Sequence, residues 1–316
     1  MLLAIRHRTE YRYDAPVRES VMELWAQPRQ CVRQRLLDFA IELEPAAQLF
    51  SYADSFGNAV YHFDVPQPHR RLVIHASATV ESAAGAPLPE RLEKAEWARL
   101  AAGAVLDQHF DFLQPHGLVA PTRALQQFVR SRQLEALRAD DPLTAIRTLS
   151  SRLYEAFEYE PGVTEADSPI DHALESGRGV CQDFAHVMIA ICRPWGLPAR
   201  YVSGYLFTDA AGGDRSNPEA THAWVEVFLP SLGWVGLDPT NNAVAGERHI
   251  AVATGRDYAD VPPSRGVYKG QAESELEVRV SVRKASGGGV EVGRALRLAT
   301  IGSGRRPARI ARLGEA

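Results

Sequence analysis

Apolar and polar residues alternate along much of the first 81 residues, which is the period expected for β-strands with one buried face. The alternating segments are rich in aromatic and β-branched residues and are separated by clusters of turn-forming residues. They cover residues 5–13, 36–43, 58–65 and 72–80. The pattern therefore predicts a small all-β N-terminal domain over residues 1–81, with a sandwich-like or meander arrangement.

A helical period replaces the alternation further along the chain. Apolar residues at steps of three and four predict three helices. These helices are expected over residues 90–104, 122–137 and 142–157. Asp141 is a suitable N-cap for the last helix, and Pro142 suits its first position. Residues 82–141 are therefore interpreted as a connector and a helical layer that lead into the next domain.

Another apolar stripe at helical spacing begins just after a cysteine. The stripe consists of Phe184, Val187, Met188, Ile191 and Trp195. Gly177 and Gly179 favour a sharp turn before the helix, so the helix is expected to begin near Cys181. A thiol there faces free backbone N–H groups and the positive end of the helix dipole, which both favour the thiolate. Cys181 is therefore a candidate nucleophile, although a free cysteine is more often a small buried hydrophobe.

Two short strands downstream supply candidate partners for this thiol. In residues 222–229 one face is continuously apolar, whereas the other carries His222 and Glu226 beside aromatic residues. A second strand ends at Asp238, just before a proline. A turn at residues 230–233 would join the strands in a hairpin and place Asp238 beside His222. A nucleophile, a base and a residue that orients the base then follow one another along the chain.

The motifs around these three residues resemble those of the transglutaminase-like superfamily. They are Gly-Val-Cys-Gln-Asp-Phe-Ala, Pro-Ala-Arg-Tyr-Val-Ser-Gly-Tyr, His-Ala-Trp-Val-Glu-Val and Gly-Trp-x-x-x-Asp-Pro-Thr-Asn. More narrowly, the chain is similar to bacterial proteins with a β-rich region before this core. The resemblance implies an α+β fold, with a papain-like or transglutaminase-like core in which the nucleophile helix packs on an antiparallel sheet. It also implies a Cys181–His222–Asp238 triad and amide chemistry through a thioester.

Four more residues are candidates for the oxyanion site or the substrate groove. Tyr159, in a loop before the nucleophile, and Gln182, directly after it, could each assist the Cys181 backbone N–H in holding an oxyanion. The ordinary alternatives are a loop anchor for the tyrosine and a helix cap for the glutamine. Trp224 and Trp234 could wall a hydrophobic tunnel that shields the thioester from water.

The remaining segments complete the expected domain organisation. Residues 208–219 form a polar loop before His222 and are expected at the rim of the groove. Acidic and aromatic residues at 255–263 could recognise an amine or a peptide end, with a surface turn as the alternative. An alternating segment at 276–282 is expected to close the core, which then covers residues 142–285. The arginine-rich residues 286–316 are expected to be a mobile basic tail.

Composition narrows the class of protein and its compartment. The net charge of −4 gives no electrostatic reason to bind nucleic acid. Three cysteines without metal-like spacing predict neither a disulfide framework nor a zinc site, and no metal or cofactor is expected. The first apolar run is too short for a signal peptide, and no segment approaches a membrane span. A cytoplasmic protein without a membrane partner is therefore expected.

Three functions are compatible with these features. The leading hypothesis is a cysteine-dependent hydrolase of peptide or protein amide and isopeptide bonds, because water is the commonest acceptor and no dedicated amine site is evident. The second is an acyl transferase that cross-links protein glutamine or transfers the acyl group to a small amine. The third is a non-catalytic binding or assembly protein on the same scaffold. Neither the substrate nor the oligomeric state follows from the sequence.

Overall fold

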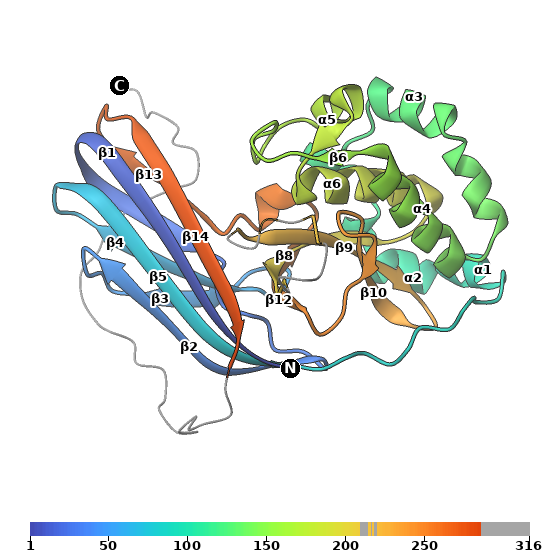
Figure 1. Cartoon of the computed structure of the whole chain (residues 1–316), viewed down its shortest axis with the longest axis horizontal. Coiled ribbons are helices and arrows are strands. Elements are labelled where there is room, and N and C mark those ends of the chain that lie inside the picture. Colours follow the sequence, from blue (N-terminus) through green and yellow to red (C-terminus); the bar gives the residue numbers. More distant parts are fainter. Residues whose placement is uncertain (209–213, 216, 218–219, 286–316) are drawn as a thin grey trace.

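The computed structural model describes residues 1–208, 214–215, 217 and 220–285. It contains two large antiparallel sheets and a helical layer, in agreement with the expected α+β class. Figure 1 shows the N-terminal sheet on the left, and the second sheet with its helices on the right. Among the helices of the described ranges, none combines the length and the apolar character needed to cross a bilayer. Most of the predicted loop at 208–219 lies outside the described residues. The predicted basic tail at 286–316 lies outside them entirely.

The N-terminal region forms the predicted strands, and they are long and antiparallel. Their order in the sheet is β2-β5-β1-β4-β3. The strands are β1 (Leu2–Leu24), β2 (Gln34–Glu44), β3 (Phe50–Ala53), β4 (Ala59–Val65) and β5 (His69–Ser82). Strand β1 pairs with β5 in its first half and with β4 in its second half, so it runs through the whole sheet. Inward-facing side chains such as Tyr11, Met22 and Phe63 form one buried cluster there.

Two strands from the end of the described chain complete this sheet. Strand β13 (Ser264–Lys269) pairs with the second half of β1, and β14 (Ser274–Lys284) pairs with the first half. The strand expected at 276–282 therefore exists, but the prediction that it closes the catalytic core was wrong. Alternation in a sequence reports that a strand has one buried face, whereas its partner strand is decided by packing between distant segments.

The helical layer follows the prediction best where the local signals are strongest. Helix α4 (Pro142–Ala156) begins at the expected cap, because the Asp141 carboxylate accepts from the N–H groups of Leu143 and Thr144. The helix expected at 90–104 is shorter and interrupted, and the one expected at 122–137 ends early, before Gln133 in a left-handed conformation. The other α-helices are α1 (Glu96–Leu100), α2 (Gly103–Gln108), α3 (Arg123–Ser131), α5 (Ile170–Ser176) and α6 (Cys181–Cys192).

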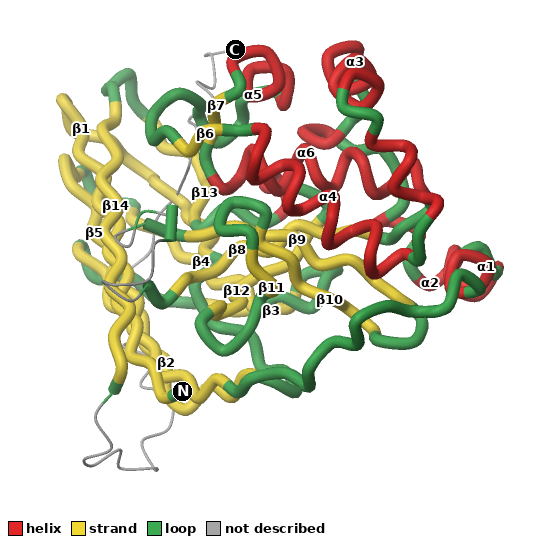
Figure 2. Tube along the Cα trace, turned by 45° about the vertical axis from the view of Figure 1, so that its right-hand side comes forward, coloured by secondary structure: helices red, strands yellow, loops and turns green. Residues whose placement is uncertain are grey.

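The second sheet carries the buried helix α6 on one face. Its order is β11-β10-β9-β8-β12. Its strands are β8 (Ala199–Leu206), β9 (His222–Leu229), β10 (Gly233–Asp238), β11 (Ala243–Val244) and β12 (His249–Gly255). Figure 2 shows α4 and α6 over one side of these strands. The predicted apolar face of β9, with Val225 and Val227, joins Val187 and Ile191 of α6 in one core. Two short strands, β6 (Glu158–Tyr159) and β7 (Arg178–Gly179), pair beside the start of α6.

Two buried amide side chains join the N-terminal region to strand β12, which lies at the edge of the second sheet. The amide of Gln34 donates to the carbonyl of Ala251 at 2.8 Å and accepts from its N–H at 2.9 Å. The amide of Asn58 makes the same pair of bonds with Thr254, both at 2.9 Å. Each amide thus takes the place of a neighbouring strand, and we call these two residues the amide clamps. They satisfy backbone groups that an open edge would leave unpaired.

Two fully buried histidines make the stability of the fold dependent on pH. His7 lies against the hydroxyl of Tyr205 at 3.0 Å, and His186 accepts from the N–H of Tyr258 at 3.1 Å. Burial lowers the pKa of each to about 4. The unfolded chain therefore binds more protons below pH 6.5, so stability is lost as the pH falls from 6.5 towards 4.

Between pH 7 and pH 5 we expect each of these histidines to reduce the free energy of unfolding by about 2 kcal/mol. Urea unfolding at both pH values checks this in the wild type and in His186→Gln, which retains an acceptor but does not titrate. The variant is expected to lose less stability than the wild type between the two pH values. His75→Gln, the matched substitution at an exposed position, is the control for the loss of an imidazole. An unaltered pH dependence in His186→Gln would contradict the assignment.

Candidate active site

The thiol of Cys181 stands at the first residue of α6, at the end of a tightly held turn. Asp183 accepts from the backbone N–H of Val180 at 2.8 Å and from the hydroxyl of Thr164 at 2.6 Å. A Cβ atom at Gly179 would lie 2.8 Å from the same Asp183 carboxylate, so glycine is required for this close approach. The turn therefore fixes the Cys181 side chain, which is half-buried, at the rim of the helix end.

The start of α6 presents unused hydrogen-bond donors beside the thiol. The backbone N–H groups of Cys181 and Gln182 donate to no acceptor among the described residues, whereas the N–H of Asp183 already bonds to the carbonyl of Val180 at 2.9 Å. The first turn of a helix carries a partial positive charge in addition. This end of the helix can therefore stabilise negative charge on sulfur or on a carbonyl oxygen.

His222 lies between the thiol and a carboxylate. Its Nε2 atom is 2.8 Å from Oδ2 of Asp238, and its side chain also hydrogen-bonds to Cys181, which leaves Nδ1 for the thiol. Burial disfavours the charged imidazole, but the charge of Asp238, the hydrogen bond to it and the contact with Cys181 together raise the pKa of His222 well above its usual value. The three residues predicted from the motifs are thus brought together.

Asp238 is fully buried and saturated with donors. Its Oδ1 atom accepts from the N–H groups of Thr240 at 3.0 Å and Asn241 at 3.2 Å. Its Oδ2 atom accepts from the Asn241 amide at 2.8 Å and from His222. It also accepts from a second imidazole, that of His249, at 3.1 Å. Burial raises the pKa of a carboxyl group, but His222 and these hydrogen bonds hold the pKa of Asp238 well below its usual range. Asp238 is therefore an anion at all working pH values.

Sequence reasoning missed His249, which begins strand β12. The residue follows Asp238 by eleven positions and is not part of a recognisable motif around it. No strand was predicted over residues 249–255, and nothing in that run indicates its distance from β10. His222, Asp238 and His249 also have the donor types of a metal site, with donor atoms within 4.8 Å of one another. The hydrogen bonds of Asp238 to His222 and to His249 account for the closeness of these three side chains without a metal ion.

The two oxyanion candidates occupy different environments. The amide of Gln182 donates to the carbonyl of Ala166 at 2.6 Å, so it anchors the preceding loop. Gln182 is therefore better explained as a structural anchor than as a free oxyanion donor. The hydroxyl of Tyr159 accepts a long hydrogen bond of 3.4 Å from the N–H of Asn217. Burial, followed by the charge of Cys181, raises the pKa of Tyr159, so this phenol stays protonated and remains a candidate donor.

The two tryptophans, whose pairing in a tunnel would have favoured acyl transfer, lie apart and do not form one wall. Trp224 is only 2% exposed and packs beneath the sheet against Val202 and Ala245. Trp234 lies at the opposite end of the β9–β10 hairpin from His222, where its ring contacts Phe228 and the guanidinium of Arg200. A period of two assigns residues to a face of a strand, whereas it does not say how far apart they lie along that face.

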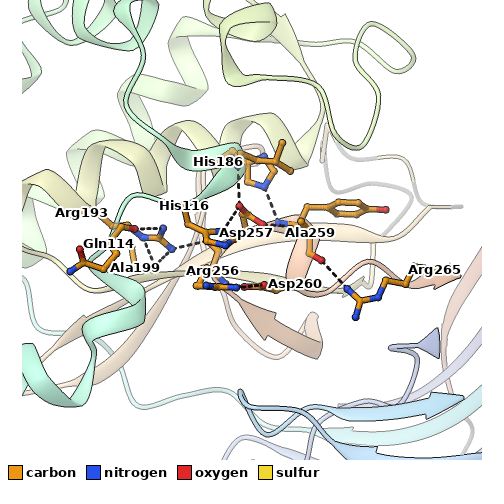
Figure 3. A network of polar contacts seen from close by, with 12 residues as sticks. Gln114, His116, His186, Arg193, Ala199, Arg256, Asp257, Ala259, Asp260 and Arg265 are labelled. Carbon is orange, nitrogen blue, oxygen red and sulfur yellow. Dashed lines mark hydrogen bonds and ion pairs between the residues drawn. The ribbon is translucent and has the colours of Figure 1, made fainter. Parts of the chain in front are cut away.

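The acidic segment at 255–263 has a structural role, but it is not the surface turn of the alternative prediction, because Asp257 and Val261 are buried. Asp257 is fully buried and accepts from His116 at 2.8 Å and from the backbone N–H of Leu118 at 3.0 Å. Asp260 forms two hydrogen bonds with the guanidinium of Arg256. Figure 3 shows these contacts beside His186 and Arg193. The Asp257 carboxylate therefore holds this segment against residues 116–118, the Asp260 carboxylate holds Arg256, and neither is free to recognise an amine.

Comparison with known proteins supports the same core. Residues 3–81 match the model of the bacterial transglutaminase-like N-terminal region, and residues 132–239 match that of the transglutaminase-like superfamily. An uncharacterized protein of Mycobacterium tuberculosis is 37% identical over 295 residues, which cover 88% of this chain and 91% of the relative. A protein-glutamine gamma-glutamyltransferase of Pseudomonas aeruginosa is 34% identical over 147 residues, 41% of this chain and 21% of the relative.

One solved structure resembles nearly the whole chain. It is described as a "Putative Cysteine Protease from Cytophaga hutchinsonii", and it superimposes with a TM-score of 0.68 at 20% sequence identity. The superposition covers 90% of this chain and 92% of the other. At this identity the likeness concerns the fold alone, and it extends over both the N-terminal region and the core.

Proposed function

Because the chain belongs to the transglutaminase-like superfamily, we propose that it is a cysteine enzyme that hydrolyses peptide or isopeptide amide bonds through a thioester. The observation that carries the proposal is the arrangement at Cys181. A half-buried thiol at a helix start contacts a histidine whose other ring nitrogen is held at 2.8 Å by a buried carboxylate. This arrangement needs no cofactor. A reducing compartment such as the cytoplasm suits it, because the thiol must stay reduced.

The first half of the reaction forms the thioester. His222 takes the proton of the Cys181 thiol, and the thiolate attacks the carbonyl carbon of the amide. The resulting oxyanion is held by the free backbone N–H groups at the start of α6, with the Tyr159 hydroxyl as a further candidate donor. His222 then protonates the leaving amine as the carbon–nitrogen bond breaks. Asp238 remains ionised throughout and stabilises the charged imidazole.

The second half of the reaction releases the acyl group. Water attacks the thioester carbonyl while His222 takes one of its protons. The carbon–sulfur bond then breaks, and His222 passes this proton to the leaving sulfur, which gives a carboxylic acid and the free thiol. An amine could replace water and give acyl transfer. The named Pseudomonas transglutaminase among the relatives favours this second candidate function. The separation of Trp224 from Trp234 favours hydrolysis, because within the described residues these two indoles do not together shield the thioester from water.

The reactivity of the three free cysteines tests the proposal within one chain. We expect iodoacetamide at pH 6.5 to alkylate Cys181 at least about tenfold faster than the exposed Cys31, because thiolate is the reacting species. The buried Cys192 serves as an unreactive internal reference. In His222→Ala the rate at Cys181 should fall to that of Cys31, as followed by mass spectrometry of the peptides. The matched control is replacement of the exposed His75 by alanine.

Equal rates at Cys181 and Cys31 in the wild type would overturn the catalytic proposal and favour the non-catalytic binding protein. The choice of acceptor is tested separately with casein and a fluorescent primary amine, with Cys181→Ala as the blank. Hydrolysis predicts new amino termini on casein in excess of incorporated fluorescence. The opposite ratio would make the chain an acyl transferase.

A further inference from the structure

We propose that His249 is a positioning residue that holds the Asp238 carboxylate against His222 as a fixed, neutral hydrogen-bond donor. The inference rests on the proposed function, and it concerns a residue outside the Cys181–His222–Asp238 set. His249 is the first residue of β12, at the edge of the sheet, whereas Asp238 ends β10. The imidazole therefore contacts the carboxylate on the face of the sheet that carries Trp224, away from α6.

The hydrogen bonds of His249 assign its tautomer. The backbone N–H of Gly246 donates to Nδ1 at 3.2 Å, so Nδ1 carries a lone pair. The proton then resides on Nε2, which lies 3.1 Å from Oδ2 of Asp238. The edge of the Trp224 indole packs against the imidazole, with ring centroids 5.2 Å apart and planes at 74°. Backbone, carboxylate and indole together leave the ring one orientation.

The surroundings of His249 keep the ring uncharged. Its side chain is only 4% exposed, and burial lowers its pKa, although Asp238 opposes this shift. The charged form of His222 and the guanidinium of Arg248 act in the same direction as burial. Arg248 itself is paired with Asp214 at 2.7 Å. The ring therefore supplies a hydrogen bond without neutralising the carboxylate, so Asp238 keeps its full charge for His222.

The consequence for the nucleophile is geometric. Oδ2 of Asp238 accepts hydrogen bonds from three donors, which are His222, His249 and the Asn241 amide. Loss of the His249 donor leaves Oδ2 with two of its three donors, so the carboxylate orients the His222 ring towards the thiol less firmly. Since the alkylation of Cys181 depends on that contact, His249 should influence a sulfur atom that it does not touch.

The test compares two variants by the rate of Cys181 alkylation with iodoacetamide, measured from pH 5 to pH 9. His249→Leu should lower the rate at pH 6.5 by about tenfold and alter the pH profile. His249→Gln retains a neutral N–H donor and should restore the rate to within about threefold of the wild type. The thermal midpoint of each variant is recorded, because a purely structural residue would lower the midpoint in both variants without separating their pH profiles.

A double-mutant comparison shows whether His249 acts through His222. In the His222→Ala background, His249→Leu should leave the alkylation rate unchanged, because no base remains to be positioned. A tenfold further loss in that background would overturn the inference, as would a wild-type rate and profile in His249→Leu. If instead the wild-type Cys181 reacts no faster than Cys31, the proposed function itself fails. The two failures are therefore distinguishable.

Discussion

Asp238→Asn is expected to lower amide turnover by about 10³- to 10⁴-fold, the largest loss we expect from an isosteric change. An asparagine offers one acceptor atom, whereas five donor groups converge on the Asp238 carboxylate. If its NH₂ group faces His222, the imidazole must keep its proton on Nδ1, towards the thiol, and cannot accept the proton of Cys181. If it faces the backbone instead, two N–H groups lose their acceptor. The charged imidazole loses its counter-ion in both orientations.

The measurement is the initial rate of cleavage or amine incorporation with the casein assay, together with the urea midpoint. We also expect Asp238→Asn to reduce the free energy of unfolding by about 1–3 kcal/mol, because buried donors are left without a good acceptor. Asp64→Asn, the same change at an exposed position, should alter neither quantity. Turnover within tenfold of the wild type in Asp238→Asn would rule out this carboxylate as the partner of His222.

Asn58→Leu is expected to reduce the free energy of unfolding by about 3–5 kcal/mol. Leucine has the same number and branching of side-chain heavy atoms, but it cannot replace any of the hydrogen bonds of this fully buried amide. The N–H and carbonyl groups of Thr254 would lose these partners, and Asp54 and the guanidinium of Arg29 would each lose one of several. Because Asn58 is one of the amide clamps, the loss should also loosen the N-terminal region from β12.

Urea unfolding with separate probes of the two regions checks this expectation. Trp25 directly follows β1 and packs in the cluster that the N-terminal region shares with the core, whereas Trp224 lies in a separate cluster of the second sheet, so single-tryptophan versions report on the contact and on the second sheet. Gln127→Leu makes the same kind of change at an exposed helical position and should shift stability by less than about 0.5 kcal/mol. An Asn58→Leu chain that unfolds at the wild-type urea concentration would show that the amide clamps contribute little.

The parts of the fold that sequence reasoning anticipated are those governed by local interactions. The start of α4 follows from Asp141 and Pro142, because a cap and a restricted backbone angle act within a few residues. The approach of Asp238 to His222 follows from the β9–β10 hairpin, whose short turn sets the register of both strands. The meeting of this hairpin with Cys181 was inferred from the family motifs and not from periodicity.

The parts that were missed depend on contacts between distant segments. His249 reaches Asp238 only because β12 returns to the sheet beside β8, an order that the sequence of β12 does not specify. The burial of Trp224 depends on Gly204, where a Cβ atom would lie 2.7 Å from the indole and 2.2 Å from a carbonyl oxygen of β12. Neither requirement is visible from the alternation of apolar and polar residues, because each involves three separate strands.

The pairing of β1 with β14 has a consequence for the synthesis of the protein. Residues 3–13 pair with residues 274–284, so one strand leaves the ribosome early and its neighbour leaves it late. At ordinary elongation rates of ~5–20 residues per second, the delay between them is about 15 to 50 seconds. During that interval β1 can pair with β5, but its other edge has no intramolecular partner. Nascent chains are therefore expected to need protection of this edge, and a translational pause before residue 274 would lengthen the period of risk.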